Sequence, residues 1–447
     1  MKKILLSLLG LIAYEGMAQQ SFVGLRTSTY GGALSTISNP AHALWARPWD
    51  VNVLAVDANL GNNEMGFSFD LENSFKKFTD NLANSKAIDA RINADVLGPS
   101  FIVRVNKRNA VGLVSRLRVM AGTTGIDANV LQAIMDAKNM NLSNNLGSYK
   151  ELRGISDMNV LANAFREIGA VWSYTLMNDG YNIIRLGAGV KLVQGTGSFY
   201  MGFKGANANS FSLGKDAKGD PILHVKDAKA EVRSGGLDVL GSPDFFATSA
   251  STVAADLGVI YEYSEDGCPN CDGHIPYRFK VGVALLDLGK LSYTTNNKSY
   301  RYDIVNQDIN LNDVQKSLDM VPRPQELGGT SFKSSLPTTL NVNVDYRFVD
   351  GFYVNLSSQL NMVSKNEYNA RYSNDFVLTP RYETHWGGGV FGAFLPISYN
   401  EVSGFNTGVA LHVGPLIFGS RSVFGNLIGS SKELNAFVGL RFGNIYQ

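Results

Sequence analysis

The chain has 447 residues and a formal net charge of +1, with 40 basic and 39 acidic residues. This balance excludes a strongly charged surface that would recruit nucleic acid or acidic partners. A mean hydropathy of -0.05, 46 glycines, 19 tyrosines and 24 phenylalanines fit either a secreted β-sandwich array or a transmembrane β-barrel, whose strands bury only alternate residues in lipid. The pattern along the chain has to separate these two classes.

The N-terminus has the pattern of a secretory signal peptide. Lys2 and Lys3 precede an apolar run, and small residues follow at positions 16–18. The run of about 10 residues is short of the roughly 20 that a spanning helix needs. We therefore expect residues 1–18 to be removed and the mature chain to begin near Gln19. No cysteine lies near the cleavage site, which excludes a lipoprotein.

Period-two alternation predicts β-strands through most of the remaining chain. In residues 340–348 every even position is apolar or aromatic and every odd position is polar or charged, and residues 352–361 repeat the pattern after a tight turn. About fourteen such strands are expected, near 51–70, 99–106, 110–120, 168–177, 181–195, 251–264, 276–289, 340–348, 352–361, 370–379, 381–392, 404–413, 415–422 and 435–445.

The connections between these strands alternate in length. Short links are expected at 106–109, 177–180, 349–351, 379–380 and 414–415, with a medium one at 265–275. Long links are expected at 71–98, 121–167, 196–250, 290–336 and 393–403, and only 363–367 breaks the trend. Outer-membrane barrels have short periplasmic turns and long extracellular loops, whereas a sandwich has no reason to alternate. Residues 51–447 are therefore predicted to form an all-β, antiparallel transmembrane barrel of about 14 strands, with both termini in the periplasm.

Short helices are expected in the long extracellular loops, because apolar residues recur there at helical spacing. The two sets are Ile126, Val130, Leu131, Ile134 and Met135, and Leu161, Phe165 and Ile168. Their apolar faces either pack against the barrel rim, which we favour, or contact a ligand.

Residues 19–50 do not alternate, and Asn39-Pro40-Ala41 has the pattern of a turn into a helix. This Asn-Pro-Ala motif resembles the FadL-type barrels, whose N-terminal segment plugs the lumen ahead of fourteen strands and which carry hydrophobic molecules such as long-chain fatty acids across the outer membrane. The segments SNPAHAL, VGVALLDLGKLSY, LPTTLNVNVDYRF and GVALHVGPLIFGS resemble an uncharacterised family of Bacteroidota outer-membrane barrels, distantly related to FadL and PorV. The resemblance implies a plug, or hatch, at Asn39, Pro40 and Ala41, and it supplies no catalytic residues.

Alternation also predicts which charged side chains line the lumen. The set is Arg104, Arg116, Arg118, Arg185, Lys191, Arg278, Lys280, Arg347 and Arg441, against Asp256, Glu262 and Asp345. On this count the lumen is basic, which would attract anionic groups such as a carboxylate. The other interpretation, which we favour, is that these charges pair with acids from the plug and the loops and fix the shape of the barrel.

Cys268 and Cys271 lie in the medium-length turn that is predicted to be periplasmic. A Cys-x-x-Cys pair can be a redox centre, half of a zinc site or a disulfide. Zinc would need further ligands and only His274 is near, while a redox centre would need a thioredoxin-like context. We therefore expect a structural disulfide in an oxidising compartment.

The histidines are scattered, with no nucleophile motif beside them, so no catalytic, metal or cofactor site is expected: His42, His224, His274, His385 and His412. The first functional hypothesis is a FadL-like passive channel for a small hydrophobic or amphipathic solute. The alternative is a scaffold or accessory subunit of a larger outer-membrane assembly, of the secretion or barrel-insertion type. An enzyme is the third and least favoured. The expected partners are outer-membrane lipids and other outer-membrane or periplasmic proteins, and no nucleic acid.

Overall fold

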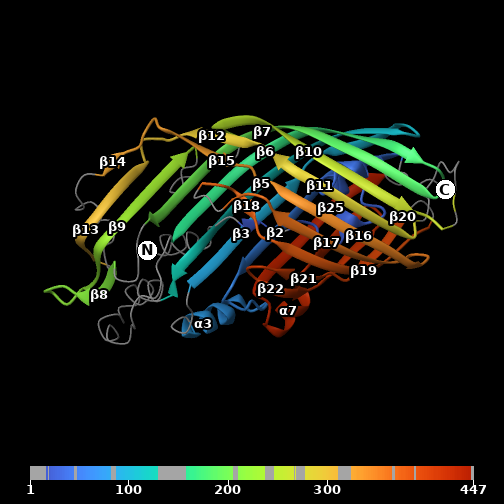
Figure 1. Cartoon of the computed structure of the whole chain (residues 1–447). Helices are drawn as coiled ribbons and strands as arrows, with labels where there is room; N and C mark the ends of the chain where they lie inside the picture. Colours follow the sequence, from blue (N-terminus) through green and yellow to red (C-terminus); the bar gives the residue numbers. More distant parts are fainter. Residues whose placement is uncertain are drawn as a thin grey trace.

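The computed structural model describes residues 17–18, 20–44, 48–81, 87–128, 158–204, 210–236, 246–265, 267, 277–310, 324–364, 368–386 and 389–443. The strands within these ranges form a closed antiparallel β-barrel of 14 strands, as the sequence predicts (Figure 1). No helix in the described residues is long and apolar enough to cross a membrane.

The wall of the barrel follows chain order, and pairing of β2 with β25 closes it. Three wall strands are interrupted and carry two labels each: β3–β4, β20–β21 and β22–β23. The wall strands are β2 (Trp49–Asn62), β3 (Ala87–Leu97) with β4 (Ser100–Asn106), β5 (Asn109–Asp127), β6 (Asn159–Asn178), β7 (Asn182–Lys204), β10 (Ala250–Tyr263), β11 (Phe279–Leu288), β16 (Thr339–Val349), β17 (Phe352–Asn361), β19 (Asp375–Trp386), β20 (Gly389–Phe394) with β21 (Ile397–Asn400), β22 (Gly404–Thr407) with β23 (Val409–Val413), β24 (Leu416–Ser420) and β25 (Glu433–Gly443).

Apolar side chains cover the outside of the wall and polar side chains fill the inside. On neighbouring strands, Val344 and Leu356 face outward and are exposed, whereas Asp345 and Asn355 face inward and are buried. The same alternation repeats around the barrel. A closed wall leaves no strand edge unpaired, and an apolar exterior suits lipid. The barrel is therefore built to span a membrane.

Further elements lie inside the barrel or continue beyond it at the long-loop rim. The N-terminal segment holds η1 (Leu25–Thr27), α2 (Ala33–Thr36) and η2 (Pro40–Leu44); β1 (Met17–Ala18) pairs with β18 (Arg371–Tyr372); and β12 (Lys290–Thr294) pairs with β15 (Ser331–Ser335). Beyond the wall, the end of β7 pairs with β9 (Pro221–Gly235). Strand β9 also pairs with β8 (Phe211–Lys215) and with β13 (Tyr300–Asn310), and β13 in turn pairs with β14 (Gln325–Glu326). These strands project at one end of the molecule, where α3 (Leu71–Asn81) and α7 (Val423–Ile428) also lie (Figure 1).

Several predicted loops are in fact strands. The first strand ends at Asn62, and the expected loop 71–98 contains α3 and β3. The loop 196–250 contains the end of β7 with β8 and β9, and the loop 290–336 contains β12, β13, β14 and β15. The inward face of β3 carries Arg91, Asn93 and Asp95, and these charged residues gave the segment the polarity of a loop. The charged side chains on the lumen face are therefore the reason that β3 was not predicted as a strand.

The helix predicted from Leu161, Phe165 and Ile168 is wrong. These residues lie in β6, which pairs with β5 on one side and β7 on the other. Both faces of β6 are apolar there, so the spacing of three and four residues coincides with a helical period without a helix. Ile126 likewise lies in β5, and the rest of that predicted helix, 130–135, is outside the described residues.

The turn predicted at Thr379–Pro380 is also wrong, because β19 runs through both residues. Proline is tolerated there because the strand opposite is interrupted: the backbone N–H of Leu395, between β20 and β21, donates to the carbonyl of Pro380 at 3.0 Å. The loop predicted at 393–403 shrinks to the three residues between β21 and β22. The number of wall strands is unchanged, but the tenth and eleventh begin several residues later than predicted.

Candidate functional site: the filled lumen

Residues 20–44, called the plug below, lie inside the barrel. Every one of them is buried except Gly32, which is half-buried. The segment contains one arginine, one histidine and no carboxylate. It therefore cannot supply acids to the charged wall, and the wall has to supply partners to the plug.

The Asn39-Pro40-Ala41 turn of the plug fits a dent in the wall. Gly187 of β7 and Gly258 of β10 are cross-strand partners that both face the lumen. A Cβ on Gly187 would lie 2.0 Å from the backbone nitrogen of Ala41, and one on Gly258 would lie 2.1 Å from Oδ1 of Asn39. These glycines therefore leave the space that the turn occupies.

Asn39 fixes the turn by hydrogen bonds in two directions. Its side-chain amide donates to the backbone carbonyls of Val259 (3.2 Å) and Val283 (3.3 Å) on two wall strands. Its Oδ1 accepts from the backbone N–H of Ala41 at 2.9 Å. The predicted hatch residues thus form one buried contact between plug and wall.

Carboxylates of the wall hold the backbone of the plug. The N–H of Phe22 donates to Asp57 at 2.6 Å, that of Thr29 to Glu383 at 3.1 Å, and that of Ala33 to Asp50 at 2.8 Å. Ala33 is the first residue of α2, so Asp50 acts as a cap supplied from the wall. Arg441 pairs with Asp50 at 2.6 Å and offsets its charge.

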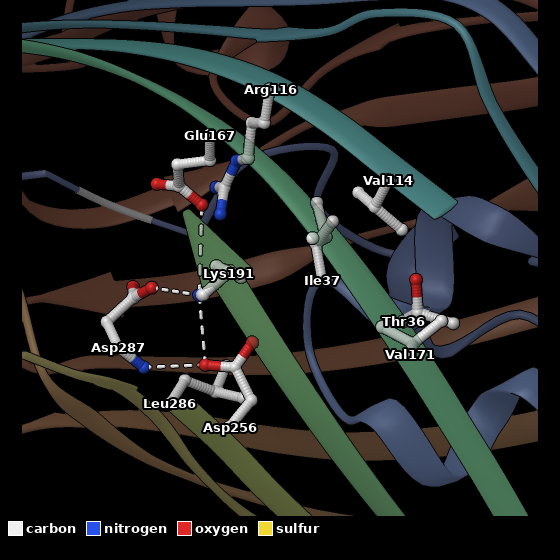
Figure 2. A pocket seen from close by; sticks show the side chains of 11 residues that line it. Thr36, Ile37, Val114, Arg116, Glu167, Val171, Lys191, Asp256, Leu286 and Asp287 are labelled. Carbon is white, nitrogen blue, oxygen red and sulfur yellow. Dashed lines mark hydrogen bonds and ion pairs between the residues drawn. The ribbon is translucent and has the colours of Figure 1, made fainter. Parts of the chain in front are cut away.

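Five charged side chains form a cluster on consecutive wall strands beside the plug, and Figure 2 shows four of them, Glu167, Lys191, Asp256 and Asp287. Lys191 lies 2.9 Å from Asp256 and 3.7 Å from Glu167, and it also pairs with Asp287. Arg118 pairs with Glu167 and, at 2.7 Å, with Asp287. Each charge is buried and each has an opposite charge within reach, which is the condition for a buried ionic network to persist.

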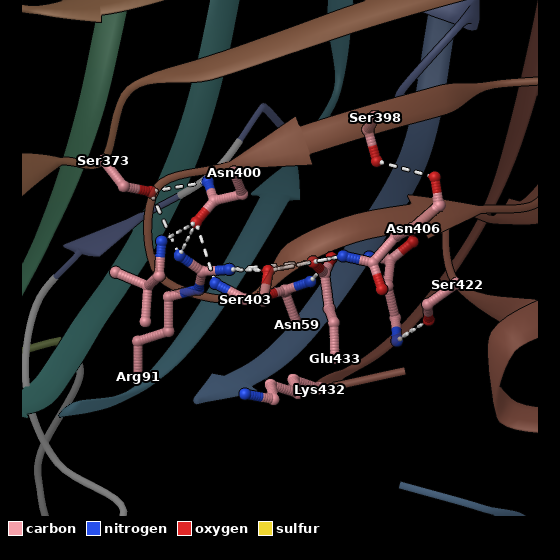
Figure 3. A network of polar contacts seen from close by, with 12 residues as sticks. Asn59, Arg91, Ser373, Ser398, Asn400, Ser403, Asn406, Ser422, Lys432 and Glu433 are labelled. Atoms are coloured by element: carbon pink, nitrogen blue, oxygen red, sulfur yellow. Dashed lines mark hydrogen bonds and ion pairs between the residues drawn. The ribbon is translucent and has the colours of Figure 1, made fainter. Parts of the chain in front are cut away.

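Two further networks continue around the lumen. Arg381 pairs with Asp345 at 2.6 Å and with Glu383 at 2.7 Å, and Lys280 lies 3.6 Å from Asp345. Arg421 pairs with Asp375 at 2.7 Å. The second network extends through Glu433, Arg91 and a group of serine and asparagine side chains, as Figure 3 shows. Together these networks link wall strands that are not neighbours in the sheet, such as β5 with β11 and β16 with β19.

The charged residues predicted to line the lumen fall into two groups. Nine lie deep in the lumen: Arg116, Arg118, Arg185, Lys191, Asp256, Glu262, Lys280, Asp345 and Arg441. All of them are buried except Arg185 and Lys191, which are nearly so. The other three lie near the short-turn rim, where Arg347 is buried and Arg278 is half-buried. Arg347 pairs with the exposed Asp350 at 3.0 Å, Arg278 lies 3.3 Å from Glu265, and Arg104 is half-buried.

The prediction of a basic lumen needs correction, because the buried bases are matched by acids that the sequence analysis did not single out. These are Asp50, Asp57, Asp95, Glu167, Asp287, Asp375, Glu383 and Glu433. They belong to wall strands, whereas the sequence analysis expected the partner acids in the plug and the loops. Strict alternation would have found Glu167, which shares a face with Ser173 and Val171, had β6 been recognised from its first residue.

An apolar cluster fills the lumen on the long-loop side of these networks. Phe165, Val193 and Ala254 from the wall pack against the two-stranded sheet of β12 and β15, which contributes Tyr293 and Phe332. The two rings lie 5.6 Å apart and are stacked. The lumen therefore changes, along its length, from an apolar zone to a charged zone and then to the plug.

Two hollows lie on either side of the wall at β6. A cavity of about 30 Å³, enough for about two water molecules, lies between Ile37 of the plug, Lys191 and Val171 (Figure 2). On the outer wall, an apolar hollow of about 420 Å³ is lined by side chains that include Leu113, Trp172 and again Val171. Val171 thus lies at both hollows.

Comparison with known proteins gives a family. Residues 48–420 match a family of unknown function, DUF5723. The chain belongs to this family. No curated protein matches the sequence. The DUF5723 chain is thus an outer-membrane-type β-barrel of a family without an assigned activity.

Several solved structures are similar to the DUF5723 barrel over most of its length. They include the Pseudomonas putida toluene transporter TodX (9% identity, 98% of this chain and 100% of that chain, TM-score 0.42), the monoaromatic hydrocarbon channel CymD (12%, 98% and 98%, 0.42) and a Pseudomonas aeruginosa FadL homologue (11%, 96% and 99%, 0.32).

The remaining predicted site residues do not come together in the DUF5723 barrel. His42 is buried in the plug, His412 is buried in β23 and His385 accepts or donates a hydrogen bond with Tyr30 at 3.1 Å. Among the described residues no three histidine, cysteine, aspartate or glutamate side chains are arranged to hold a metal ion. The predicted disulfide of Cys268 and Cys271 lies outside the described residues.

Proposed function

We propose that this protein is a passive channel in the bacterial outer membrane for a small hydrophobic or amphipathic solute, with the plug as its gate. The observation that carries the proposal is the position of Val171, which lines both the lumen cavity and the apolar hollow on the outer wall. If displacement of the plug widens this cavity, only the wall at Val171 separates a solute there from the lipid.

Strand β6 supplies a continuous path toward Val171. Its lumen-facing residues run from Phe165 in the apolar cluster, through Glu167 in the charged network, to Gly169 and Val171 at the cavity. Successive lumen-facing residues of a strand are about 7 Å apart, so the path is about 20 Å long. An apolar entry followed by a charged zone suits a molecule with an apolar body and a polar head.

The described conformation is the closed one. The plug fills the lumen at the short-turn side, and the two-stranded sheet of β12 and β15 fills the apolar zone. Opening then requires the plug to leave the dent at Gly187 and Gly258, which breaks the hydrogen bonds of Asn39 but leaves the wall pairing intact. The plug can therefore move without breaking the hydrogen bonds between wall strands, and a gate requires this independence.

Uptake measurements with variants of Val171 test the proposal. Cells that lack their own hydrophobic-solute channels would express the protein, and uptake of radiolabelled toluene and of a long-chain fatty acid would be followed. We expect Val171→Ala to raise uptake several-fold and Val171→Trp to lower it, whereas Val344→Ala, the same change on the lipid face of β16, leaves it unaltered. Uptake equal to that of cells without the protein, in all three variants and in the native chain, would refute the proposal.

The proposal also sets an orientation. The short-turn rim, where β2 begins and β25 ends, would face the periplasm, since outer-membrane barrels have short periplasmic turns and long extracellular loops. Protease added to intact cells should then cleave near Lys218, in the turn between β8 and β9, and spare the turn at Asp179 until the outer membrane is opened. The reverse pattern would invert the orientation.

A second candidate function is a non-transporting scaffold within a larger envelope assembly. The observation that favours it is the filled lumen, in which the buried networks join wall strands that are not neighbours in the sheet. Purification in mild detergent distinguishes the two: a stable stoichiometric partner with no solute uptake would favour the scaffold, and an isolated barrel that supports uptake would favour the channel.

A further inference from the structure

Helix α7 at the long-loop rim is oriented with its polar side inward. Asn426 is buried, and its amide donates to the backbone carbonyls of Glu433 at 2.7 Å and Phe67 at 3.3 Å. The apolar side chains point the other way: Leu427 is 64% exposed and Ile428 is 80% exposed. A helix that faced water would bury its apolar side and expose its asparagine, so α7 has the reverse of the usual amphipathic arrangement.

Aromatic side chains from neighbouring elements extend the apolar face of α7. Phe69 precedes α3 and is 63% exposed, and the chain beside it is tied to the end of α7, since the N–H of Phe67 donates to the carbonyl of Ser431 at 2.6 Å. Phe405 of β22 is 77% exposed, and its ring lies 5.0 Å from that of Tyr399 of β21. Figure 1 shows α7 beside β22 and β21, at the same end of the barrel as α3.

The inward side of this region is polar, as it is in the wall. Asn406, next to Phe405, faces inward and donates to Glu433 at 3.0 Å, and Ser431 donates to Asn406 at 2.6 Å (Figure 3). The arrangement of polar inside and apolar outside therefore continues without a break from β21 and β22 into α7. Helix α7 itself carries no charged residue.

We propose that α7, with Phe69 and Phe405, is an interfacial lipid-binding surface that inserts into the membrane leaflet at the long-loop rim. Continuity with the lipid-facing wall selects lipid as the occupant, because the same outward face carries the apolar belt on β21 and β22. Tyr399 and Phe405 lie next to the long-loop ends of their strands, and outer-membrane barrels carry a girdle of aromatic residues at the edge of the lipid-facing band. A short apolar helix beyond that edge would lie in the boundary between headgroups and acyl chains. This inference needs the barrel to span a membrane but does not depend on transport.

Spin labels in proteoliposomes test the proposed surface. The background would be the full chain with Cys268→Ser and Cys271→Ser, and single cysteines would be introduced by Ile428→Cys or Leu427→Cys and labelled with a nitroxide. Leu356→Cys, on the lipid face of β17, and Lys218→Cys, in the exposed turn between β8 and β9, are the lipid and water references. The protein is purified and reconstituted alone in phospholipid vesicles, and collision rates with molecular oxygen and with a water-soluble nickel chelate are compared.

We expect the ratio of oxygen to nickel collisions at Ile428 and Leu427 to resemble that at Leu356 and to exceed that at Lys218 several-fold. A ratio at both α7 positions that resembles the one at Lys218 would overturn the proposal and would leave the apolar face for a partner protein. Because Ile428 and Leu427 are exposed and make no buried contact, labelling either of them should leave the barrel folded, which heat-modifiable migration in electrophoresis checks.

Discussion

The fit of the plug into the wall predicts a large effect from a very small change, Gly187→Ala. The added methyl group would lie 2.0 Å from the backbone nitrogen of Ala41 and 2.4 Å from the carbonyl carbon of Pro40. Both atoms are backbone, so no side-chain rotation relieves the clash, and the Asn39-Pro40-Ala41 turn has to move. The wall itself should tolerate alanine, because Gly187 lies inside a β-strand and has no positive φ.

Overpacking of this kind costs about 2 kcal/mol, which is roughly a 30-fold change in the ratio of displaced to seated plug. We expect protease to cut the plug of Gly187→Ala faster than that of the native protein, while the barrel keeps its heat-modifiable migration. Gly214→Ala is the matched control, since its methyl group would find its nearest neighbour, in Ile222, at an ordinary 3.7 Å. If Gly187→Ala and Gly214→Ala are cut at the same rate as the native protein, the plug is not held by this dent.

Two further predictions concern the charged groups. Arg118→Met leaves Glu167 and Asp287 without their arginine, so the free energy of unfolding measured by thermal denaturation should fall by roughly 3–5 kcal/mol. Arg108→Met, in the exposed turn before β5, is the control and should leave that free energy unchanged. Equal losses in the two variants would mean that the buried pairs do not stabilise the barrel. Burial alone would raise the pKa of Glu231, in the projecting sheet, but hydrogen bonds from Tyr368, Arg233 and Arg301 lower it to about 2. The ionised Glu231 side chain therefore stabilises β9 and β13 above a pH of about 4.5, and this stabilisation is lost as the pH falls through about 2. Pepsin should then cut this sheet much faster at the lower pH. The Glu231→Gln variant should lose most of that difference in cleavage rate.

The wall was predictable where one face of a strand meets lipid and the other carries uncharged polar groups. Residues 340–348 satisfy that condition, and the structure has a strand there with the predicted register of faces. Strand β3 does not satisfy it, because Arg91 and Asp95 on its inward face make the segment look like a loop. Strand β6 fails for the opposite reason, since its first half is apolar on both faces and its lumen side there packs into the inner apolar cluster.

The contacts of the plug could not be read from sequence for a different reason. Asn39, Pro40 and Ala41 stood out as a motif, but the glycines that receive them, Gly187 and Gly258, lie more than a hundred residues away and look like any other strand glycine. Their pairing depends on the register between β7 and β10, which sequence patterns do not specify across a long connection. The charge balance of the lumen was missed in the same way, because it is a sum over strands whose faces must all be known.

The most direct test of the gated channel is electrical recording from planar bilayers that contain the purified protein, with and without residues 20–48. The native chain should be closed or nearly so, and the deletion variant should show discrete conductance steps, because removing the plug empties the short-turn half of the lumen while the wall pairings from β2 to β25 remain. A deletion variant that is folded by heat-modifiable migration, yet as silent as the native chain, would contradict the proposal that the plug gates a channel.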